Sequence, residues 1–377
     1  MMGAHADDLI ARALSGPTTW PADMDADLVA GRAIYHGVTG LLIARAAHIA
    51  AWPEVLHTKL RAEAVAQTMW EIRHRAVLLS LLAALVQSGV DTVLLKGTAL
   101  AYGLYPAPTQ RSRGDTDLLV APKDLERART VMAAQGFVCE KSLSEAAEPE
   151  RAENWVMQIP GGGHHEIDLH VDVFSSPALA TVLDCATAQN VAVGLPQLSP
   201  EARALPLSLA LMQACLHRAQ HVVSPYLVDG QRHYGGDRLI WLMDVDLAMR
   251  ALTSHEQSRF VTAATRGGVG PLCAATLRSA AALLGTPCPP DVIAALDRGP
   301  VGPASRYLAQ NRAIGRVFED IRALPGLRNR LRHAGRRLFP PEAAMRSRYP
   351  DLANAPLPYL HLRRIAGIWR RHKADKK

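Results

Sequence analysis

The sequence predicts an α+β protein in which a small mixed β-sheet core is flanked by N-terminal and C-terminal helical segments. Ala, Leu and Arg, which favour helix, are abundant along the chain. Apolar residues recur at helical spacing towards both ends, and short β-branched runs lie between these regions. We therefore expect a helical segment at 1–87, an α/β core at 88–200, a helical domain at 201–325 and a basic tail at 326–377.

The N-terminal segment contains two stretches with helical periodicity, Leu28–Ala47 and Leu60–Val86. Pro53 separates them, and Gly89 is a suitable stop for the second. This segment is therefore expected to be helical throughout.

The α/β core begins where the hydrophobic period changes. Pro160–Gly163 is typical of a hairpin turn, and we expect the adjacent His164 and His165 to be exposed. Gly136 is placed to end a helix. The predicted strands are Val90–Leu95, Thr116–Ala121, Phe137–Glu140, Asn154–Ile159 and Glu166–Phe174, and the predicted helices are Ala99–Tyr105 and Leu125–Gln135.

Two carboxylates stand two residues apart in the second predicted strand. Because side chains alternate along a strand, Asp115 and Asp117 project from the same face. Like charges held close together repel each other, so the pair calls for a cation. Mg²⁺ prefers carboxylate oxygens together with substrate phosphates. The pattern predicts a Mg²⁺ site.

The strand predicted over Glu166–Phe174 has an acidic face. Glu166, Asp168, His170 and Asp172 fall on one side by the period of two, and apolar residues fall on the other. An apolar back and an acidic front indicate a sheet that lines a site. Asp168 is placed to supply the third carboxylate, and Glu166 and His170 are candidates for lining the cleft.

A strand, a glycine and a helix start occur together at Lys96, Gly97 and Thr98. Gly97 allows the backbone to approach a phosphate, and a helix N-terminus offers free N–H groups and a favourable dipole. Thr98 is suited to be the N-cap or a phosphate-binding hydroxyl. Arg111 and Arg113 follow, and either guanidinium could grip a phosphate or a carboxylate in bidentate fashion.

The helical domain contains two groups of polar residues at helical spacing. His217 and His221 lie four residues apart on one face, and we expect them to line the cleft opposite the acidic strand, with a packed pair as the alternative. Arg238, Trp241 and Asp244 also share a face, which predicts an internal Arg–Asp pair capped by Trp. The predicted helices are Leu205–Val223, Arg238–Ala251, His255–Thr265 and Leu272–Leu284.

The positive charge of the chain is concentrated in the tail. Residues 325–377 hold eleven Arg and three Lys against three acidic residues, a net charge of +11, so the remainder is net −4 within the total of +7. The tail aromatics are spread out, whereas single-strand binders combine charge with stacking platforms. We expect tail helices that pack partly against the acidic body, a turn at Phe339-Pro340-Pro341, and nucleic-acid binding that is weak and without sequence preference.

The cysteines and apolar runs favour a cytoplasmic protein. The five cysteines are odd in number and widely spaced, with no C-x-x-C, which argues against a disulfide framework or a zinc knuckle. The N-terminus shows no signal-peptide pattern, and the apolar runs are too short to span a bilayer.

These motifs together resemble a known group of enzymes. Gly97-Thr98, Asp115-x-Asp117 and a later strand aspartate are similar to the polymerase-β-type nucleotidyltransferase superfamily. The resemblance is closer to a bacterial family labelled uncharacterised nucleotidyltransferase. It is carried by Leu94–Gly97, Tyr105-Pro106, Arg113–Val120, Asp168-Leu169-His170 and Arg238-Leu239-x-Trp241-Leu242-x-Asp244. Some members of that family sit among genes for ribosomally made, modified peptides such as lasso peptides.

The resemblance implies Mg²⁺-dependent transfer of a nucleotidyl group from an NTP, with ATP as the expected donor. Asp115 and Asp117 would hold the metal, and Asp168 would bind a second ion or act as base. The turn at 96–98, with Arg111 and Arg113, would hold the phosphates. The acceptor stays open between a modified peptide and a small molecule. The alternatives are a kinase-like phosphotransferase on the same scaffold and a non-catalytic nucleotide- or peptide-binding accessory.

Overall fold

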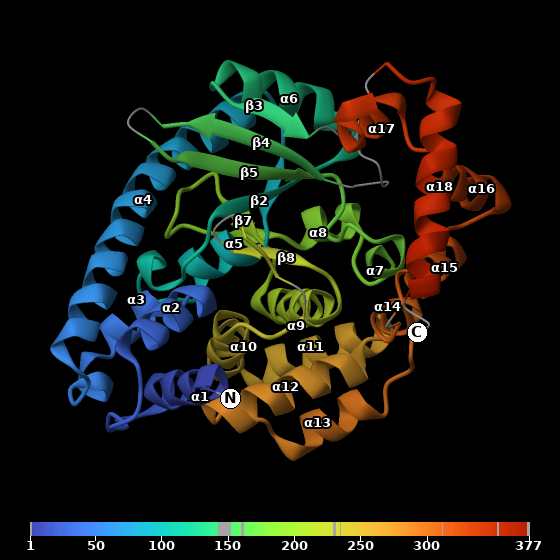
Figure 1. The fold of residues 1–377 in the computed structure, drawn as a ribbon. Coiled ribbons are helices and arrows are strands. Elements are labelled where there is room, and N and C mark those ends of the chain that lie inside the picture. The colour runs from blue at the N-terminus through green and yellow to red at the C-terminus, as the bar shows by residue number, and fades with distance from the viewer. Residues whose placement is uncertain are drawn as a thin grey trace.

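A mixed β-sheet lies between helices drawn from both ends of the chain (Figure 1). The computed structural model describes residues 2–141, 152–159, 162–228, 231–233, 235–310, 312–352 and 354–374. The predicted α+β class, with helical segments flanking a small mixed sheet, is confirmed. The four predicted segment boundaries stay a prediction.

Seven strands of the described residues form the main sheet, in the order β3-β4-β5-β2-β1-β7-β6. Their bounds are β1 Thr92–Leu94, β2 Asp115–Val120, β3 Val138–Lys141, β4 Ala152–Gln158, β5 His164–His170, β6 Val193–Gly194 and β7 Arg203–Ala204. β2 runs antiparallel to β1 and parallel to β5, and β4 and β5 pair antiparallel as the predicted hairpin. β8 (Tyr226–Val228) and β9 (Gln231–His233) form a separate hairpin.

The long helix α4 (Glu54–Gln87) and helix α6 (Leu125–Ala134) cover one face of the sheet. Leu118 of β2 and Ile167 of β5 pack there against α4 residues such as Leu78. The next residue along β2, Leu119, belongs instead to the core on the opposite side of the sheet. The alternation of apolar residues along β2 thus fixes which of its side chains face α4. The other helices of this region are α5 (Lys96–Gly103), α7 (Pro177–Ala180) and α8 (Cys185–Val191).

The second hydrophobic core joins the helices before the sheet to those after it. Leu9 and Leu42 from the N-terminal helices share this core with Leu211 and Leu242 from the later helices. The N-terminal members are α1 (Met2–Ser15), α2 (Ala26–His36) and α3 (Thr39–Ala44). The later members are α9 (Leu207–Val223), α10 (Leu239–Ala251), α11 (Ser254–Arg266), α12 (Gly270–Leu284), α13 (Pro290–Asp297) and α14 (Pro303–Leu308).

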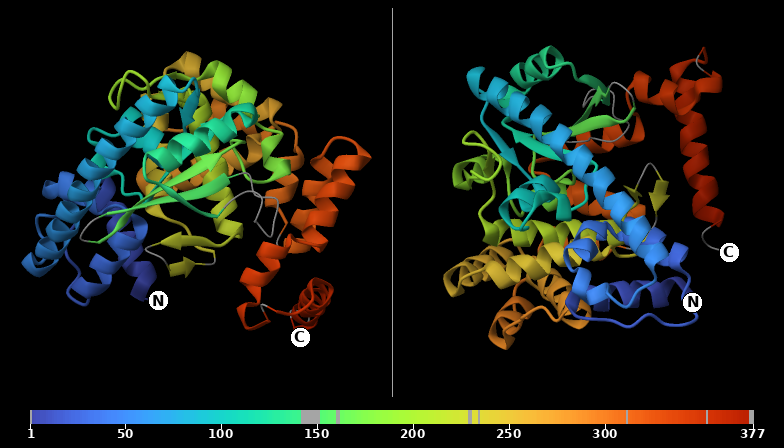
Figure 2. Two further views of the ribbon diagram at one scale, coloured as in Figure 1. Left: turned by 90° about the horizontal axis from the view of Figure 1, so that it is seen from above. Right: turned by 90° about the vertical axis from the view of Figure 1, so that its left-hand side faces the viewer.

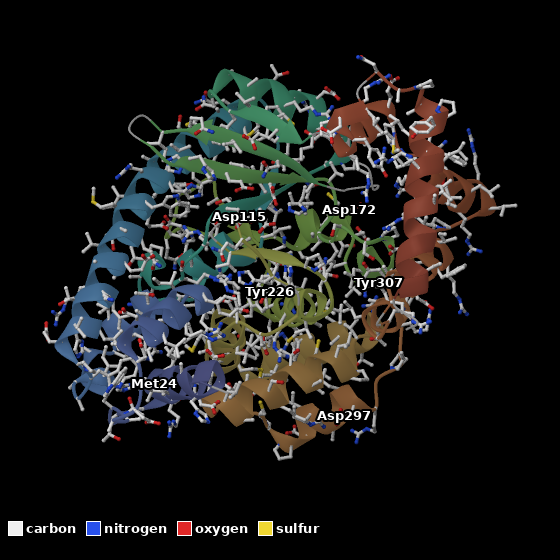
Figure 3. All side chains as sticks on the ribbon, viewed as in Figure 1. Met24, Asp115, Asp172, Tyr226, Asp297 and Tyr307 are labelled. Atoms are coloured by element: carbon white, nitrogen blue, oxygen red, sulfur yellow. The ribbon has the colours of Figure 1, made fainter. Side chains whose placement is uncertain are left out.

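Two predicted elements end earlier than expected. The helix predicted over Leu28–Ala47 is divided because Gly37 adopts φ 69°, a left-handed conformation that ends α2 before α3 begins. The strand predicted over Glu166–Phe174 ends at His170. Asp172, predicted to share the acidic face, therefore lies beyond β5 (Figure 3).

The tail forms helices along one side of the molecule (Figure 2). They are α16 (Leu327–Leu338), α17 (Glu342–Arg348) and α18 (Leu357–Ala374), and α15 (Ala313–Ala323) precedes them. The predicted turn at Phe339–Pro341 is confirmed, since it separates α16 from α17. Buried His333, Met345 and Leu360 show that part of each tail helix packs inwards. None of the described helices has the length and apolar character needed to cross a bilayer.

Candidate functional site

Strands β2 and β5 bring the predicted carboxylates together. The two strands are parallel, with Asp117 directly opposite Asp168 and Asp115 directly opposite Glu166. Because directly paired residues point to the same face, Asp168 faces the Asp115–Asp117 pair across the ladder. This confirms the predicted placement of Asp168. Figure 3 shows Asp115 near the middle of the molecule, with Tyr226 drawn below it towards the helical half.

His170 forms a close group of possible metal ligands with Asp117 and Asp168. Asp117, Asp168 and His170 each offer one ligand atom, and these atoms all lie within 4.8 Å of one another. His170 Nε2 is 2.8 Å from Asp117 Oδ1, and both residues are only 4% exposed. His170 was predicted as a cleft-lining residue. The structure places it with Asp117 and Asp168, and these three residues could hold a metal ion. We call them, together with Asp115, the carboxylate cluster.

Lys96 supplies the positive charge next to this cluster. Its ammonium group forms an ion pair with Asp117. Burial opposes ionisation of Asp117, but Lys96 and the hydrogen bond from His170 outweigh it and hold the pKa of Asp117 below its ordinary value. Burial and the nearby charges of Asp117 and Asp168 raise the pKa of Asp115 to about 7. The cluster therefore holds more negative charge than Lys96 alone can neutralise.

The turn that carries Lys96 differs from its prediction. Helix α5 begins at Lys96 itself, with Leu95 as the residue before it, so the prediction of Thr98 as the N-cap is wrong. Lys96 has φ 46°, a left-handed conformation that a non-glycine residue rarely adopts. Its backbone N–H donates to Gln213 Oε1 at 3.3 Å. The strand-to-helix turn is thus built around Lys96 and is held from helix α9.

Gly97 is required by a neighbouring side chain. A Cβ at this position would lie 2.7 Å from Arg111 Nη1. Arg111 in turn donates to both carboxylate oxygens of Asp244, at 3.2 and 2.7 Å, and Tyr105 donates to Asp244 Oδ1 at 2.7 Å. The predicted pair between Arg238 and Asp244 is therefore wrong, because Asp244 binds Arg111. The phosphate-binding role of Arg111 stays a prediction.

Arg113 and Thr98 belong to a buried network behind β2. Arg113 Nη2 forms an ion pair with Glu71 at 2.7 Å, and Arg113 Nε donates to Thr98 Oγ1 at 3.1 Å. The Thr98 hydroxyl also contacts Thr116 Oγ1 at 2.8 Å. Tyr102 donates to Glu71. The two side chains predicted to bind phosphate are thus bonded within the protein, and their nucleotide role stays a prediction.

The network continues through two histidines. His74 Nε2 lies 2.7 Å from Thr116 Oγ1, and His74 Nδ1 lies 3.2 Å from His165 Nδ1. His165 is buried, so the prediction that it would be exposed is wrong, whereas His164 is exposed. The ring of Trp70 stacks on His74 at 4.4 Å. Burial, followed by the charges of Arg113 and His165, lowers the pKa of His74 to about 3.

Asn154 of β4 was missed by the sequence reasoning. It lies opposite Asp168 in the β4–β5 register. Its amide donates to Glu166 and, at 3.1 Å, to Asp168 Oδ1. The amide thereby orients both carboxylates of β5. The signal in the sequence was a polar residue, Asn154, in the strand expected to form a hairpin with the acidic strand.

The residues predicted to face the acidic strand come from α9. His217 borders a small cavity together with Lys96 and Gln213. Burial lowers the pKa of His217 well below its ordinary value, with His221 and Lys96 adding to the effect. Burial and Lys96 lower the pKa of His221 to about 4, and its ring stacks on Trp241 at 5.3 Å. Both imidazoles are neutral at neutral pH, and their cleft-lining role stays a prediction.

Comparison with known proteins identifies the family to which these motifs belong. No curated protein matches the sequence. A family model described as "uncharacterised nucleotidyltransferase" matches residues 22–285, which include the sheet, the carboxylate cluster and helices α9 to α12. The chain therefore belongs to this nucleotidyltransferase family.

Proposed function

We propose that this protein transfers a nucleotidyl group from an NTP, with ATP as donor, to a hydroxyl or phosphate of an acceptor, and that it uses Mg²⁺. The pairing of Asp117 with Asp168 across parallel strands, with Asp115 on the same face, carries the proposal. Converging carboxylates are unfavourable unless a cation binds them, and they match the oxygen ligands that Mg²⁺ prefers. Membership of a nucleotidyltransferase family supports an NTP as the other ligand.

The chemistry follows from the charge on these residues. The acceptor oxygen attacks the α-phosphorus, a new O–P bond forms, and the bond to the bridging oxygen breaks, so that pyrophosphate leaves. Asp168 either takes the acceptor proton or holds a second ion, and both roles fit its position opposite Asp117. A divalent ion held by Asp115 and Asp117 would neutralise charge on the triphosphate. The residues around it position the reacting groups.

The triphosphate is assigned to Lys96 and the backbone of the turn. The Lys96 ammonium group is paired with Asp117, so it lies where it would bind a phosphate placed beside that carboxylate. The Lys96 N–H donates to Gln213, and the N–H groups that follow it in the first turn of α5 add donors at the same turn. Thr98, Arg111 and Arg113 would first have to leave their buried partners, so we assign them to holding the loop.

The acceptor belongs to one of two classes, a small molecule or a modified peptide, and the second class would place the enzyme in peptide natural product biosynthesis. Mass spectrometry of candidate acceptors after incubation with each NTP and Mg²⁺ distinguishes them. A mass increase equal to a nucleoside monophosphate identifies the acceptor.

Product analysis tests the proposed reaction. Wild type should release pyrophosphate from an NTP only when Mg²⁺ is present. Asp117→Asn should lower the rate by about 10²–10³-fold, the cost of removing a group that stabilises transition-state charge. Asp291→Asn, an exposed aspartate in the first turn of α13, is the matched control and should keep full activity.

The same assay separates the alternatives. Release of a nucleoside diphosphate would identify a phosphotransferase, and absence of either product with every acceptor would favour a binding accessory. An Asp117→Asn variant with unchanged turnover would contradict the assignment of the site.

A further inference from the structure

The front of the sheet carries two sets of side chains with different ligand chemistry. Asp115 and Asp117 supply only oxygen atoms. Asp117, Asp168 and His170 supply two oxygens and one imidazole nitrogen, all within 4.8 Å of one another. Because Asp117 belongs to both sets, the two positions would be adjacent. This difference in donor atoms bears on which ion each position takes.

His170 is held in the cluster by the sheet. It follows Asp168 by two residues on β5, so both side chains project from the same face. Its Nε2 contacts Asp117 Oδ1 at 2.8 Å. Among the described residues, nothing forms a hydrogen bond with His170 Nδ1, although that atom is buried. The polar contact of the ring is therefore directed at the carboxylate cluster and not at a second protein partner.

An imidazole changes the metal preference of such a site. Mg²⁺ favours oxygen ligands in octahedral geometry and usually keeps several waters. Neutral imidazole is a good ligand for first-row transition ions, whose affinity for a given nitrogen and oxygen site exceeds that of the harder alkaline-earth ions. A site with one nitrogen and two carboxylates therefore discriminates by ligand type.

We propose that Asp117, Asp168 and His170 form a mixed carboxylate–imidazole site that takes a divalent first-row transition ion in preference to Mg²⁺. Its place beside a Mg²⁺–triphosphate held by Asp115 and Asp117 rests on the proposed function. The ion binding itself does not depend on that function. Binding requires the Lys96 ammonium group to leave Asp117, which the turn allows because Lys96 is the first residue of α5 and its side chain is partly exposed.

Electron paramagnetic resonance of the full chain with Mn²⁺ tests the proposal in the absence of nucleotide. Mn²⁺ binding is read from the loss of the free-ion signal, and Mg²⁺ affinity is read from competition. Wild type should prefer Mn²⁺, and pulsed measurements should show coupling of the bound Mn²⁺ to an imidazole ¹⁴N.

The informative variant is His170→Gln, whose amide can still donate to Asp117 but provides no imidazole. Its Mn²⁺ affinity should fall by at least about 10–100-fold, the range found for loss of a residue that only supports a metal ligand, and the ¹⁴N coupling should vanish. Mg²⁺ affinity should change much less, so the Mn²⁺/Mg²⁺ preference collapses. His255→Gln removes an exposed imidazole of α11, outside the three-residue set, and should keep the preference, and circular dichroism confirms that each variant is folded.

Three results would overturn the proposal: no Mn²⁺ binding, no ¹⁴N coupling in wild type, or an unchanged Mn²⁺/Mg²⁺ ratio in His170→Gln. An equal fall in affinity for both ions would show that His170 only orients Asp117. None of these results would affect Mg²⁺-dependent pyrophosphate release, so the proposed function stands or falls by its own assay.

Discussion

The two faces of strand β2 are chemically opposite, although their residues alternate along the same six positions. The front face carries Asp115 and Asp117, which join Lys96, Asp168 and His170 in what we call the front cluster. Three carboxylates there share one lysine and one histidine. Burial, and after it the repulsion from Asp117 and Asp168, raises the pKa of Asp115 to about 7.

The back face is satisfied internally. Thr116 contacts His74 and Thr98, and Thr98 accepts from Arg113, which pairs with Glu71; we call these five residues the back network. Each of these polar side chains has a bonding partner inside the protein.

The difference separates stability from function. A fully bonded buried network contributes to the fold, and removal of one member leaves its partner unsatisfied. Excess charge in the front cluster opposes folding until a cation binds. Substitutions in the back network should therefore destabilise the protein, and neutralisation of Asp115, whose pKa is raised, should stabilise it while removing activity.

Glu71→Gln should give the largest effect on stability. The Glu71–Arg113 ion pair is buried, and loss of one charge leaves the other uncompensated, which costs about 3–5 kcal/mol. Urea unfolding measures the change. If Arg113 served mainly to bind phosphate, Glu71→Gln would alter the KM for NTP and leave the unfolding midpoint unchanged, and the two faces would not be separated in this way.

The pKa of His74 gives the back network a pH dependence. Since its pKa in the fold is about 3, below the ordinary value of 6.5, unfolded His74 takes up a proton at a pH where folded His74 does not. Stability is therefore lost as pH falls from about 6.5 towards 3, by about 2 kcal/mol at about pH 5. His74→Gln keeps a polar group but does not titrate. Its loss of stability between about pH 7 and pH 5 should be smaller by that amount, and an identical pH slope would show that His74 is not held neutral.

Asp115→Asn should give the smallest effect, with the opposite sign. The raised pKa of Asp115 means that its contribution to stability is present below its ordinary pKa and is lost as pH rises through about 7. In EDTA at about pH 8 the variant should be more stable than wild type by about 1 kcal/mol, after allowance for solvent screening. At about pH 5 the difference should shrink. A variant less stable than wild type at both values would contradict the account of the front cluster.

The front cluster was largely predictable because strand periodicity alone fixes which side chains share a face. The spacing of Asp115 and Asp117 and the acidic alternation of β5 predicted which side chains share the front face, and the parallel register that pairs Asp117 with Asp168 was added by the structure. His170 was assigned to cleft lining, because the sequence does not show that its ring reaches Asp117.

The back network was not predictable to the same degree. Glu71 and His74 come from helix α4. The residues that they contact, Arg113 and Thr116, lie more than forty positions further along the chain. Arg111 and Arg113 looked like free phosphate ligands because their carboxylate partners, Asp244 and Glu71, lie far from them in sequence. Long-range pairing of this kind leaves no local pattern.

Binding of a non-transferable nucleotide tests the central claim most directly. Isothermal titration with α,β-methylene-ATP measures nucleotide affinity without turnover, for wild type and Asp117→Asn, with Mg²⁺ and with EDTA. We predict that wild type binds only with Mg²⁺ and that Asp117→Asn weakens this binding about 10–100-fold. Binding of equal strength in EDTA, unaffected by Asp117→Asn, would contradict a metal–nucleotide site at the front cluster.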